Sequence, residues 1–306
     1  MAQLLLRNRS KGHIKDSRSD MVFNFFICLF CTLIFLIVVY PLYFVVIASF
    51  SDSTMVQQGK VVLLPAGLTI EGYSRVFKDA RIWTGYVNSI IIAIANTAVQ
   101  LFFEIQAAYA LSRKEFVPRR FINIFFVITM YVNGGMIPTY LLVTSLGFYD
   151  TLWSQIIPHC VGVWNVLIMR TAFTNSSAME LYEASAIDGA SHFRFLVQIL
   201  IPLSRAVICV IMLYSLVGAW NSYFGALMYI PTEAKQPLQM VLRRILLQNR
   251  ALQTATMGEM TSNFAMETAN QIKYAVLIVS SVPLLVLYPF LQKYFEKGVM
   301  LGSVKG

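Results

Sequence analysis

The sequence predicts an all-α integral membrane protein with six transmembrane helices. Its 306 residues are 57% hydrophobic and 13% charged, whereas about a quarter of the residues in soluble globular domains are charged. The few charges also leave long gaps, because six segments of 19 to 31 residues each contain at most one charged or histidine side chain. A membrane-spanning helix needs about 20 predominantly apolar residues. The six segments are 21–50, 82–112, 121–149, 151–169, 206–232 and 274–292.

Solid apolar runs such as residues 33–39 favour helices over a closed barrel, whose strands would alternate polar and apolar residues. The first span follows five Lys or Arg residues, which is typical of a signal peptide. Its apolar stretch is about twice as long as a signal-peptide core, however, and no small-x-small cleavage site ends it. We therefore expect an uncleaved helix, in which Pro41 permits a kink near the outer end.

The later spans are oriented by the Lys and Arg residues between them. With the N-terminus inside, one side of the membrane carries 15 Lys or Arg and 7 Asp or Glu, and the other side carries 9 and 7. Cytoplasmic loops hold the excess of basic residues, so both termini are predicted to be cytoplasmic. The net charge of +9 is therefore mainly an orientation signal. In so apolar a chain it does not indicate a nucleic-acid partner.

The sequence contains no recognisable catalytic or metal-binding motif. It lacks a G-x-x-x-x-G-K-[ST] phosphate loop, a His/Cys/carboxylate cluster with metal-ligand spacing and a Ser-His-Asp arrangement. We therefore predict a chain that is not an enzyme, with no catalytic residue, metal or cofactor of its own. An intramembrane enzyme, with a site assembled from distant residues, is the alternative.

The loop between the fourth and fifth spans is predicted to form two short helices. Glu180, Glu183 and the small residues 184–186 form a compact helical surface, Gly189 allows a close turn, and a second amphipathic piece runs to Pro202. Small side chains let another protein approach the backbone, and Glu183 offers a charge to a basic partner residue. The alternative is that the Asp-Gly pair is ordinary turn chemistry.

The same loop resembles the EAA motif of the membrane subunits of binding-protein-dependent ABC importers. That motif reads E-A-A, three residues, G, nine residues, I-x-L-P. Residues 183–185 are Glu-Ala-Ser, and Gly189, Ile199 and Pro202 follow at the motif's spacing. The two departures, Ser for Ala and Ile201 for Leu, preserve size or apolarity.

Further segments extend the resemblance over nearly the whole chain. They are similar to the maltose-transporter type of sugar permease, in the branch that imports oligosaccharides and polysaccharide fragments. The segments are 134–140, 147–153, 220–224, 237–239 and 292–306.

The resemblance implies a type I ABC importer permease fold in the bacterial plasma membrane and a role in carbohydrate import. It also implies a second, homologous permease subunit as partner, an ATPase dimer that binds ATP and Mg²⁺, and an extracytoplasmic sugar-binding protein or lipoprotein. An importer for another solute, or a secondary transporter with repeated halves, is the alternative. The implied ATPase contacts are Glu183, Ala184, Ser185, Asp188, Gly189, Ile199 and Pro202 in a coupling helix and Tyr294, Lys297 and Lys305 in the tail.

The predicted organisation has three parts. Residues 1–81 hold the cytoplasmic N-terminus, the first span and an external loop; residues 82–296 form a permease core of five spans with the coupling loop 178–203; residues 297–306 are a cytoplasmic tail. An external segment, 233–273, carries an apolar stripe at helical spacing. It is predicted to lie on the membrane or to dock a substrate-binding lipoprotein. The stripe consists of Leu238, Val241, Leu242, Ile245 and Leu246.

The second span places four polar residues at multiples of four along a slowly drifting helical face. A carboxylate within the membrane is a functional-site hypothesis by default, so one interpretation is a polar wall along the sugar pathway. The other is hydrogen bonding that holds the helices together, or a position at the cytoplasmic interface for the carboxylate. The four residues are Asn88, Asn96, Gln100 and Glu104, and weaker pathway candidates are Tyr131, Asn133, Asn221 and Tyr223.

Overall fold

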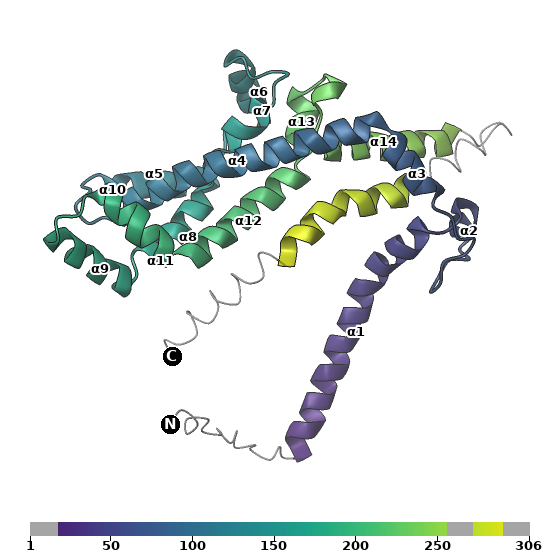
Figure 1. Ribbon diagram of the computed structural model, residues 1–306, viewed down its shortest axis with the longest axis horizontal. Helices are drawn as coiled ribbons and strands as arrows, with labels where there is room; N and C mark the ends of the chain where they lie inside the picture. The colour runs from purple at the N-terminus through teal and green to yellow at the C-terminus, as the bar shows by residue number, and fades with distance from the viewer. Residues whose placement is uncertain (1–17, 256–271, 290–306) are drawn as a thin grey trace, which may run out of the picture.

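The computed structural model describes residues 18–255 and 272–289, and every regular element in these two ranges is helical (Figure 1). Short helical turns lie at Ile157–His159, Leu196–Leu200 and Glu233–Lys235. The helices are α1 (Arg18–Ser49), α2 (Ser53–Gln57), α3 (Glu71–Lys78), α4 (Ala80–Ser112), α5 (Arg119–Tyr131), α6 (Met136–Ser145), α7 (Trp153–Ile156), α8 (Val163–Phe173), α9 (Ser176–Ile187), α10 (His192–Phe195), α11 (Ile201–Leu203), α12 (Arg205–Asn221), α13 (Phe224–Tyr229), α14 (Leu238–Ala255) and a last helix at Ile272–Pro289.

Helix α4 is the axis of the bundle. Its 33 residues extend about 50 Å at a rise of 1.5 Å per residue, and α8, α12 and α14 pack along it (Figure 1). The Asp79 carboxylate caps its first turn by accepting the Arg81 backbone N–H at 2.9 Å. At Gly85 a side chain would come within 3.1 Å of the Leu238 backbone, so glycine allows α14 to approach closely.

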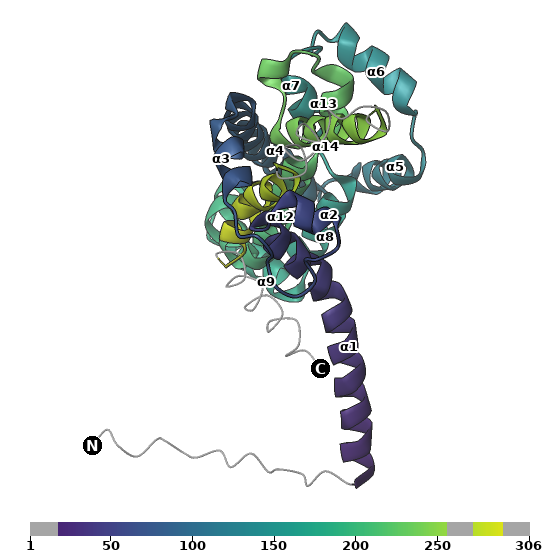
Figure 2. The same cartoon turned by 90° about the vertical axis from the view of Figure 1, so that its right-hand side faces the viewer.

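Helix α1 leaves the bundle near α2 and points away from it in both views (Figures 1 and 2). None of its most apolar stretch is buried against the described part of the chain. Within the described residues, α1 is anchored near its C-terminal end, for example by the Tyr40 hydroxyl, which donates to the Val62 carbonyl at 3.3 Å. A helix that is apolar on every side needs an apolar environment around it, so α1 lies in lipid or against another protein. Pro41 lies within the helix, as predicted.

Three of the predicted spans are not single helices. Residues 121–149 form α5 and α6, which meet at 115° around Gly135, whose φ is +88°. Residues 151–169 break between the short turn Ile157–His159 and α8 with a bend of 49°. The helix of the fifth predicted span ends at Asn221 rather than at 232, and the short helix α13 follows it. A further bend of 82° separates residues 192–203 from α12. The described residues contain three long apolar helices, or up to six spans if α5 with α6, residues 153–159 with α8, and residues 192–203 with α12 each count as one.

The apolar stripe on α14 faces the protein core. Leu238, Val241, Leu242 and Ile245 are buried in one cluster with Trp220 of α12 and with the last helix. These four side chains are therefore not themselves a membrane-facing or partner-binding surface, and the two roles predicted for segment 233–273 stay predictions. Helical periodicity indicates correctly that one face is buried, but it does not identify what covers that face.

Hydrogen bonds of Asp150 join the turn after α6 to Thr232 and Lys235 in the segment after α13. We call this group of contacts the polar latch. Asp150 has a φ of +54°; its backbone N–H donates to the Tyr229 carbonyl at 2.8 Å, and its carboxylate accepts from Lys235 at 2.7 Å and from the Thr232 hydroxyl at 2.9 Å. The hydrogen bond from Lys235 lowers the pKa of Asp150 below its usual value.

Asp150→Asn is expected to loosen this latch, because the amide has no charge to hold Lys235. The Thr232 amide, which donates to Asp150 Oδ1 at 3.3 Å, should exchange its hydrogen a few-fold faster once intrinsic rates are corrected for pH. Because the folded-state pKa is depressed, the latch is complete above the ordinary pKa of about 4 and weakens only below it. Wild-type protection that is already lost at pH 6, or equal protection in the variant, would contradict this.

Candidate functional site

Three buried polar side chains form a ladder along one face of α4. The Asn96 amide donates to Gln100 Oε1 at 3.4 Å, and the Gln100 amide donates to Glu104 Oε1 at 2.8 Å. Glu104 is 0% exposed, and its Oε1 atom also accepts the Gly162 backbone N–H at 2.8 Å and the Asn165 amide at 3.1 Å. The ladder therefore links the middle of α4 to the beginning of α8.

The contact at Gly162 requires glycine. A Cβ at this position would lie 2.9 Å from Glu104 Oε1 and 3.1 Å from the amide nitrogens of Gln100 and Asn165. Gly162 is the N-cap of α8, so the break in the predicted fourth span turns a free backbone N–H toward a carboxylate. A negative charge is favoured at a helix N-terminus, which stabilises this arrangement.

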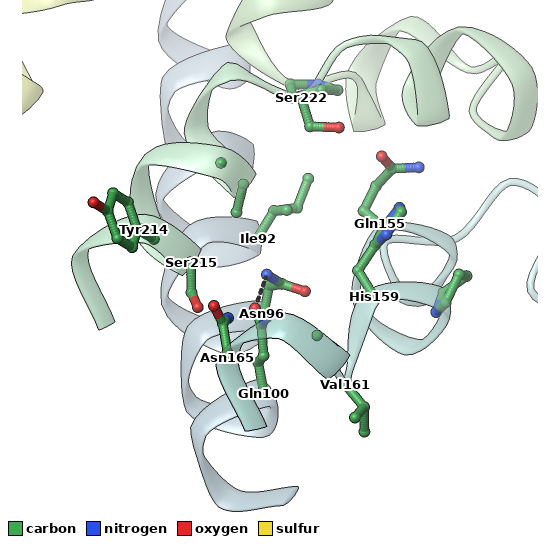
Figure 3. A pocket seen from close by; sticks show the side chains of 15 residues that line it. Ile92, Asn96, Gln100, Gln155, His159, Val161, Asn165, Tyr214, Ser215 and Ser222 are labelled. Atoms are coloured by element: carbon green, nitrogen blue, oxygen red, sulfur yellow. Dashed lines mark hydrogen bonds between the residues drawn. The ribbon is translucent and has the colours of Figure 1, made fainter. Parts of the chain in front are cut away.

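A cavity of about 350 Å³ opens beside the ladder, between α4, α7, α8 and α12 (Figure 3). Two of its lining residues have a buried polar atom without a hydrogen-bond partner in the described chain, Asn96 Oδ1 and Ser215 Oγ. Among the described residues that line the cavity, none is Lys, Arg, Asp or Glu. The polar lining consists of Asn96, Gln100, Gln155, His159, Asn165, Tyr214, Ser215 and Ser222.

A second cavity of about 360 Å³ adjoins the first and shares Pro158, His159 and Ser222 with it. Its wall includes Asn133 and Gly135 from the break between α5 and α6. The breaks inside the three predicted spans, at Asn133–Gly135, Val161–Gly162 and Ser222, therefore border these two cavities. Within a membrane, non-helical backbone is tolerated where it is buried in protein or lines a cavity, so the breaks mark where a polar molecule can be accommodated.

The structure separates the predicted pathway residues into groups. Asn96 and Gln100 line the first cavity, Glu104 is buried in the hydrogen-bond network next to it, and Asn133 lines the second cavity. Asn88 instead joins α4 to the segment before α14, because its amide donates to the Ala234 and Gln236 carbonyls at 2.9 and 3.1 Å.

The remaining three candidates line neither cavity. Tyr131 and Asn221 are exposed, and the ring of Tyr223 lies 5.4 Å from the guanidinium carbon of Arg243. Sequence reasoning missed Gln155, Asn165 and Ser215, because single polar residues in apolar segments show no period. The one available signal was the clustering of Pro158 and Gly162 within a predicted span.

The loop between α8 and α12 has the structure that its sequence predicts. Helix α9 begins after Asn175, whose side chain accepts the Ala178 N–H at 2.8 Å. It ends at Ile187, and Gly189, two residues later, has a φ of +76°. Gly189 N–H donates to the Ala186 carbonyl and Ala190 N–H to the Ser185 carbonyl, at 3.1 and 2.9 Å. This pair of bonds is a Schellman C-cap, and α10 follows directly.

Within the motif, the exposed residues differ from those that support the loop. Glu183, Ala184, Asp188 and Gly189 are exposed, whereas Ser185 is buried and Ile199 and Pro202 are half-buried. The same loop also exposes Ile187 and Phe193, at 88% and 74%. Exposed apolar side chains beside a carboxylate are typical of a protein-binding surface. The tail residues Tyr294, Lys297 and Lys305 lie outside the described residues.

Comparison with known proteins gives the family. No family model matches the chain. It is 38% identical over 281 residues to the protein LplC of Bacillus subtilis (strain 168), which covers 90% of this chain and 94% of LplC. It is 36% identical over 293 residues to the polygalacturonan/rhamnogalacturonan transport system permease protein YtcP of the same organism, which covers 96% of this chain and 100% of YtcP.

A solved structure agrees with these relatives. The crystal structure of a bacterial ABC transporter involved in the import of the acidic polysaccharide alginate matches with a TM-score of 0.81 and 30% identity, over 92% of this chain and 99% of that one. The all-helical architecture, the long apolar helices and this match together show a multi-pass bacterial membrane protein. The chain belongs to the family of ABC transporter permease subunits for carbohydrate uptake.

Proposed function

We propose that this chain forms one half of the translocation pathway of an ATP-driven importer for oligosaccharides. The observation that carries this proposal is the uncharged polar cavity at the helix breaks, with Asn96 Oδ1 and Ser215 Oγ buried and unpartnered beside it. A buried polar atom without a partner is costly. Sugar hydroxyls both donate and accept hydrogen bonds, so they suit a wall of amides and hydroxyls.

The partners are a second, homologous permease subunit, an ATPase dimer and an extracytoplasmic sugar-binding protein or lipoprotein. ATP and Mg²⁺ bind to the ATPase subunits, and this chain contributes no cofactor. The exposed surface of α9 supports the ATPase contact at the loop, with Glu183 beside apolar Ile187. The bare surface of α1 supports a second permease as neighbour, since the described part of this chain leaves it uncovered.

The proposed ATPase contact at α9 also fixes the orientation that we propose for the chain in the membrane. The end of the bundle that carries α9 and α10 lies opposite the end with α2 and α3 (Figure 1). With the ATPase on the cytoplasmic side, α9 and both termini are cytoplasmic and the chain crosses the membrane six times, counting each bent pair as one span. The cytoplasmic side is then the side with more Lys and Arg residues, 15 against 9, in agreement with the positive-inside rule.

Asn96→Ala and Ser215→Ala test the cavity as a sugar site. Each variant, assembled with its partner subunits, is expected to raise the sugar concentration for half-maximal uptake by about two- to tenfold, since a neutral hydrogen bond contributes about 0.5–1.5 kcal/mol. Uptake is measured with radiolabelled oligosaccharides of several compositions in proteoliposomes. The relative preference among these sugars should change as well.

Asn88→Ala is the matched control, because it changes the same side-chain type on the same helix away from the cavity. It should weaken assembly without changing sugar preference. Unchanged preference in both cavity variants would contradict the proposed pathway. Uptake of sugar by this chain without ATPase or second permease would contradict the importer itself and favour a secondary transporter.

A further inference from the structure

The guanidinium of Arg113 is buried at the point where α4 meets the coupling loop. Arg113 follows the last residue of α4 and is 4% exposed. Its guanidinium carbon lies 4.9 Å from the ring centre of Tyr109, 4.6 Å from that of Tyr182 and 5.4 Å from that of Phe195. These rings belong to α4, α9 and α10. A cation over aromatic faces is attracted to each of them, so one charge holds three helices together.

Hydrogen bonds of Arg113 also join α4 to α8. Its Nη2 donates to the Phe173 carbonyl at the end of α8 at 3.2 Å. In return, Arg170 of α8 donates from Nε to the Leu111 carbonyl at the end of α4 at 3.2 Å, and from Nη1 to Asn123 of α5 at 2.9 Å. Each helix thus places an arginine on the C-terminal carbonyls of the other, where the helix dipole favours positive charge.

On the side of the coupling loop, Arg113 contacts a group of aromatic rings that also pack against one another. The Tyr182 ring stacks on His192 at 5.9 Å and meets Phe195 edge-on at 5.2 Å. The Tyr109 hydroxyl and His192 Nδ1 are hydrogen-bonded at 3.0 Å. Helices α9 and α10 therefore contact the end of α4 through rigid rings rather than through flexible side chains.

Two of the helices that Arg113 contacts, α4 and α8, form two walls of the first cavity, and α7 and α12 line the rest of it. Helix α4 carries Asn96, Gln100 and Glu104, and α8 begins at Gly162, whose N–H is bonded to Glu104. The pair is therefore fastened twice, at Glu104 beside the cavity and at Arg113 beside the loop. A displacement of α9 that acts through Arg113 must move both cavity walls together.

We propose that Arg113 is the positioning residue that transmits movement of the coupling loop to α4 and α8, and so to the sugar cavity. This inference rests on the proposed function of the loop as the ATPase contact. The burial of the charge, its contacts with α4, α9 and α10, and the reciprocal arginine bonds between α4 and α8 support it.

The test uses the complete transporter in proteoliposomes, with ATP hydrolysis and sugar uptake measured on the same sample. Arg113→Met removes the charge and keeps a long, unbranched side chain. We expect the ATPase to remain bound and active while the number of sugars imported per ATP falls by at least about tenfold. Arg113→Lys keeps a cation over the rings but loses the fork of hydrogen bonds, so an intermediate ratio is expected. Arg120→Met is the matched control, because Arg120 is an exposed arginine in the first turn of α5, outside the coupling loop, and its ratio should not change.

A second pair of variants covers the case in which Arg113→Met does not assemble. Tyr182→Phe keeps the ring and should keep the ratio, whereas Tyr182→Leu removes it and should lower the ratio. Equal ratios in Arg113→Met and wild type, or in Tyr182→Leu and Tyr182→Phe, would overturn the proposal. The Glu183→Lys, Gly189→Val variant tests the ATPase contact independently, because loss of ATPase binding in it identifies the loop as that contact. Failure of the proposed role of Arg113 can therefore be distinguished from failure of the proposed ATPase contact.

Discussion

Replacing Gly189 with valine and Glu183 with lysine is expected to abolish sugar uptake while the chain still inserts into the membrane. Gly189 has a φ of +76° with open space around its α-carbon, so the penalty for valine is conformational. A left-handed backbone costs an ordinary residue about 1–2 kcal/mol, and more for a β-branched one. The Schellman cap would open, and α9 would lose the position in which it presents its exposed face. Reversing the charge of Glu183 removes the contact to a basic partner residue.

Uptake, ATPase co-purification and membrane yield are measured together on this variant. Gly147→Val is a matched control: its φ is +77°, it also has no neighbour within 4 Å, and it ends α6 with the same pattern of capping bonds. It should carry the same backbone strain without uncoupling transport from ATP hydrolysis. Wild-type uptake in the double variant, or equal uncoupling in Gly147→Val, would contradict the assignment of the coupling loop.

Features that depend on neighbouring residues could be predicted from the sequence. The two helices of the coupling loop and the turn at Gly189 are local, because their capping bonds join residues at most five positions apart, such as Ala190 and Ser185. Long, solidly apolar helices such as α1 and α4 are equally local, because composition alone determines them. The apolar stripe of α14 was recognised for the same reason.

Features that depend on distant contacts could not be predicted. Glu104 and Gly162 are 58 positions apart in the chain, and nothing in either segment identifies the other as its partner. The polar ladder on α4 was visible as a pattern, but only the structure shows that Asn88 binds the external segment while Asn96 and Gln100 face a cavity. Different parts of α4 therefore have different roles. Asn88 forms hydrogen bonds to another segment of the chain, whereas Asn96 and Gln100 form part of the cavity wall.

The missed helix breaks have a common physical reason. Absence of charge measures how well a segment tolerates lipid, and it does not measure helical continuity. The break at Gly135 is built from a glycine with a left-handed backbone and from Asn133, whose side chain accepts the Gly135 N–H at 2.9 Å. This bond offers the backbone an alternative to the helix. The Asn-Gly-Gly sequence at 133–135 was therefore the local signal of this break.

The second large effect, on stability and on sugar uptake, is expected from a change in the hydrogen-bond network around Glu104. Glu104→Leu is expected to lower the free energy of unfolding in detergent by about 3 kcal/mol or more, because each buried hydrogen-bond donor left without an acceptor costs about 1–3 kcal/mol. The Gly162 N–H and the amides of Gln100 and Asn165 all donate to Glu104 Oε1, and leucine leaves the three donors without their acceptor. The junction of α4 with α8 would then separate at the cavity, and sugar uptake should be lost.

Glu104→Gln is the control that distinguishes this network from a requirement for charge. The amide oxygen can take the place of Oε1 and accept the same three N–H groups, so assembly and stability should stay close to wild type. Because the Glu104 Oε2 atom has no partner in the described chain, the amide nitrogen displaces no existing hydrogen bond there. Denaturant unfolding of both variants, with uptake on the same preparations, measures the difference. A leucine variant as stable as wild type would show that the cavity wall does not depend on this acceptor, and a glutamine variant as unstable as leucine would show that the negative charge itself holds the start of α8.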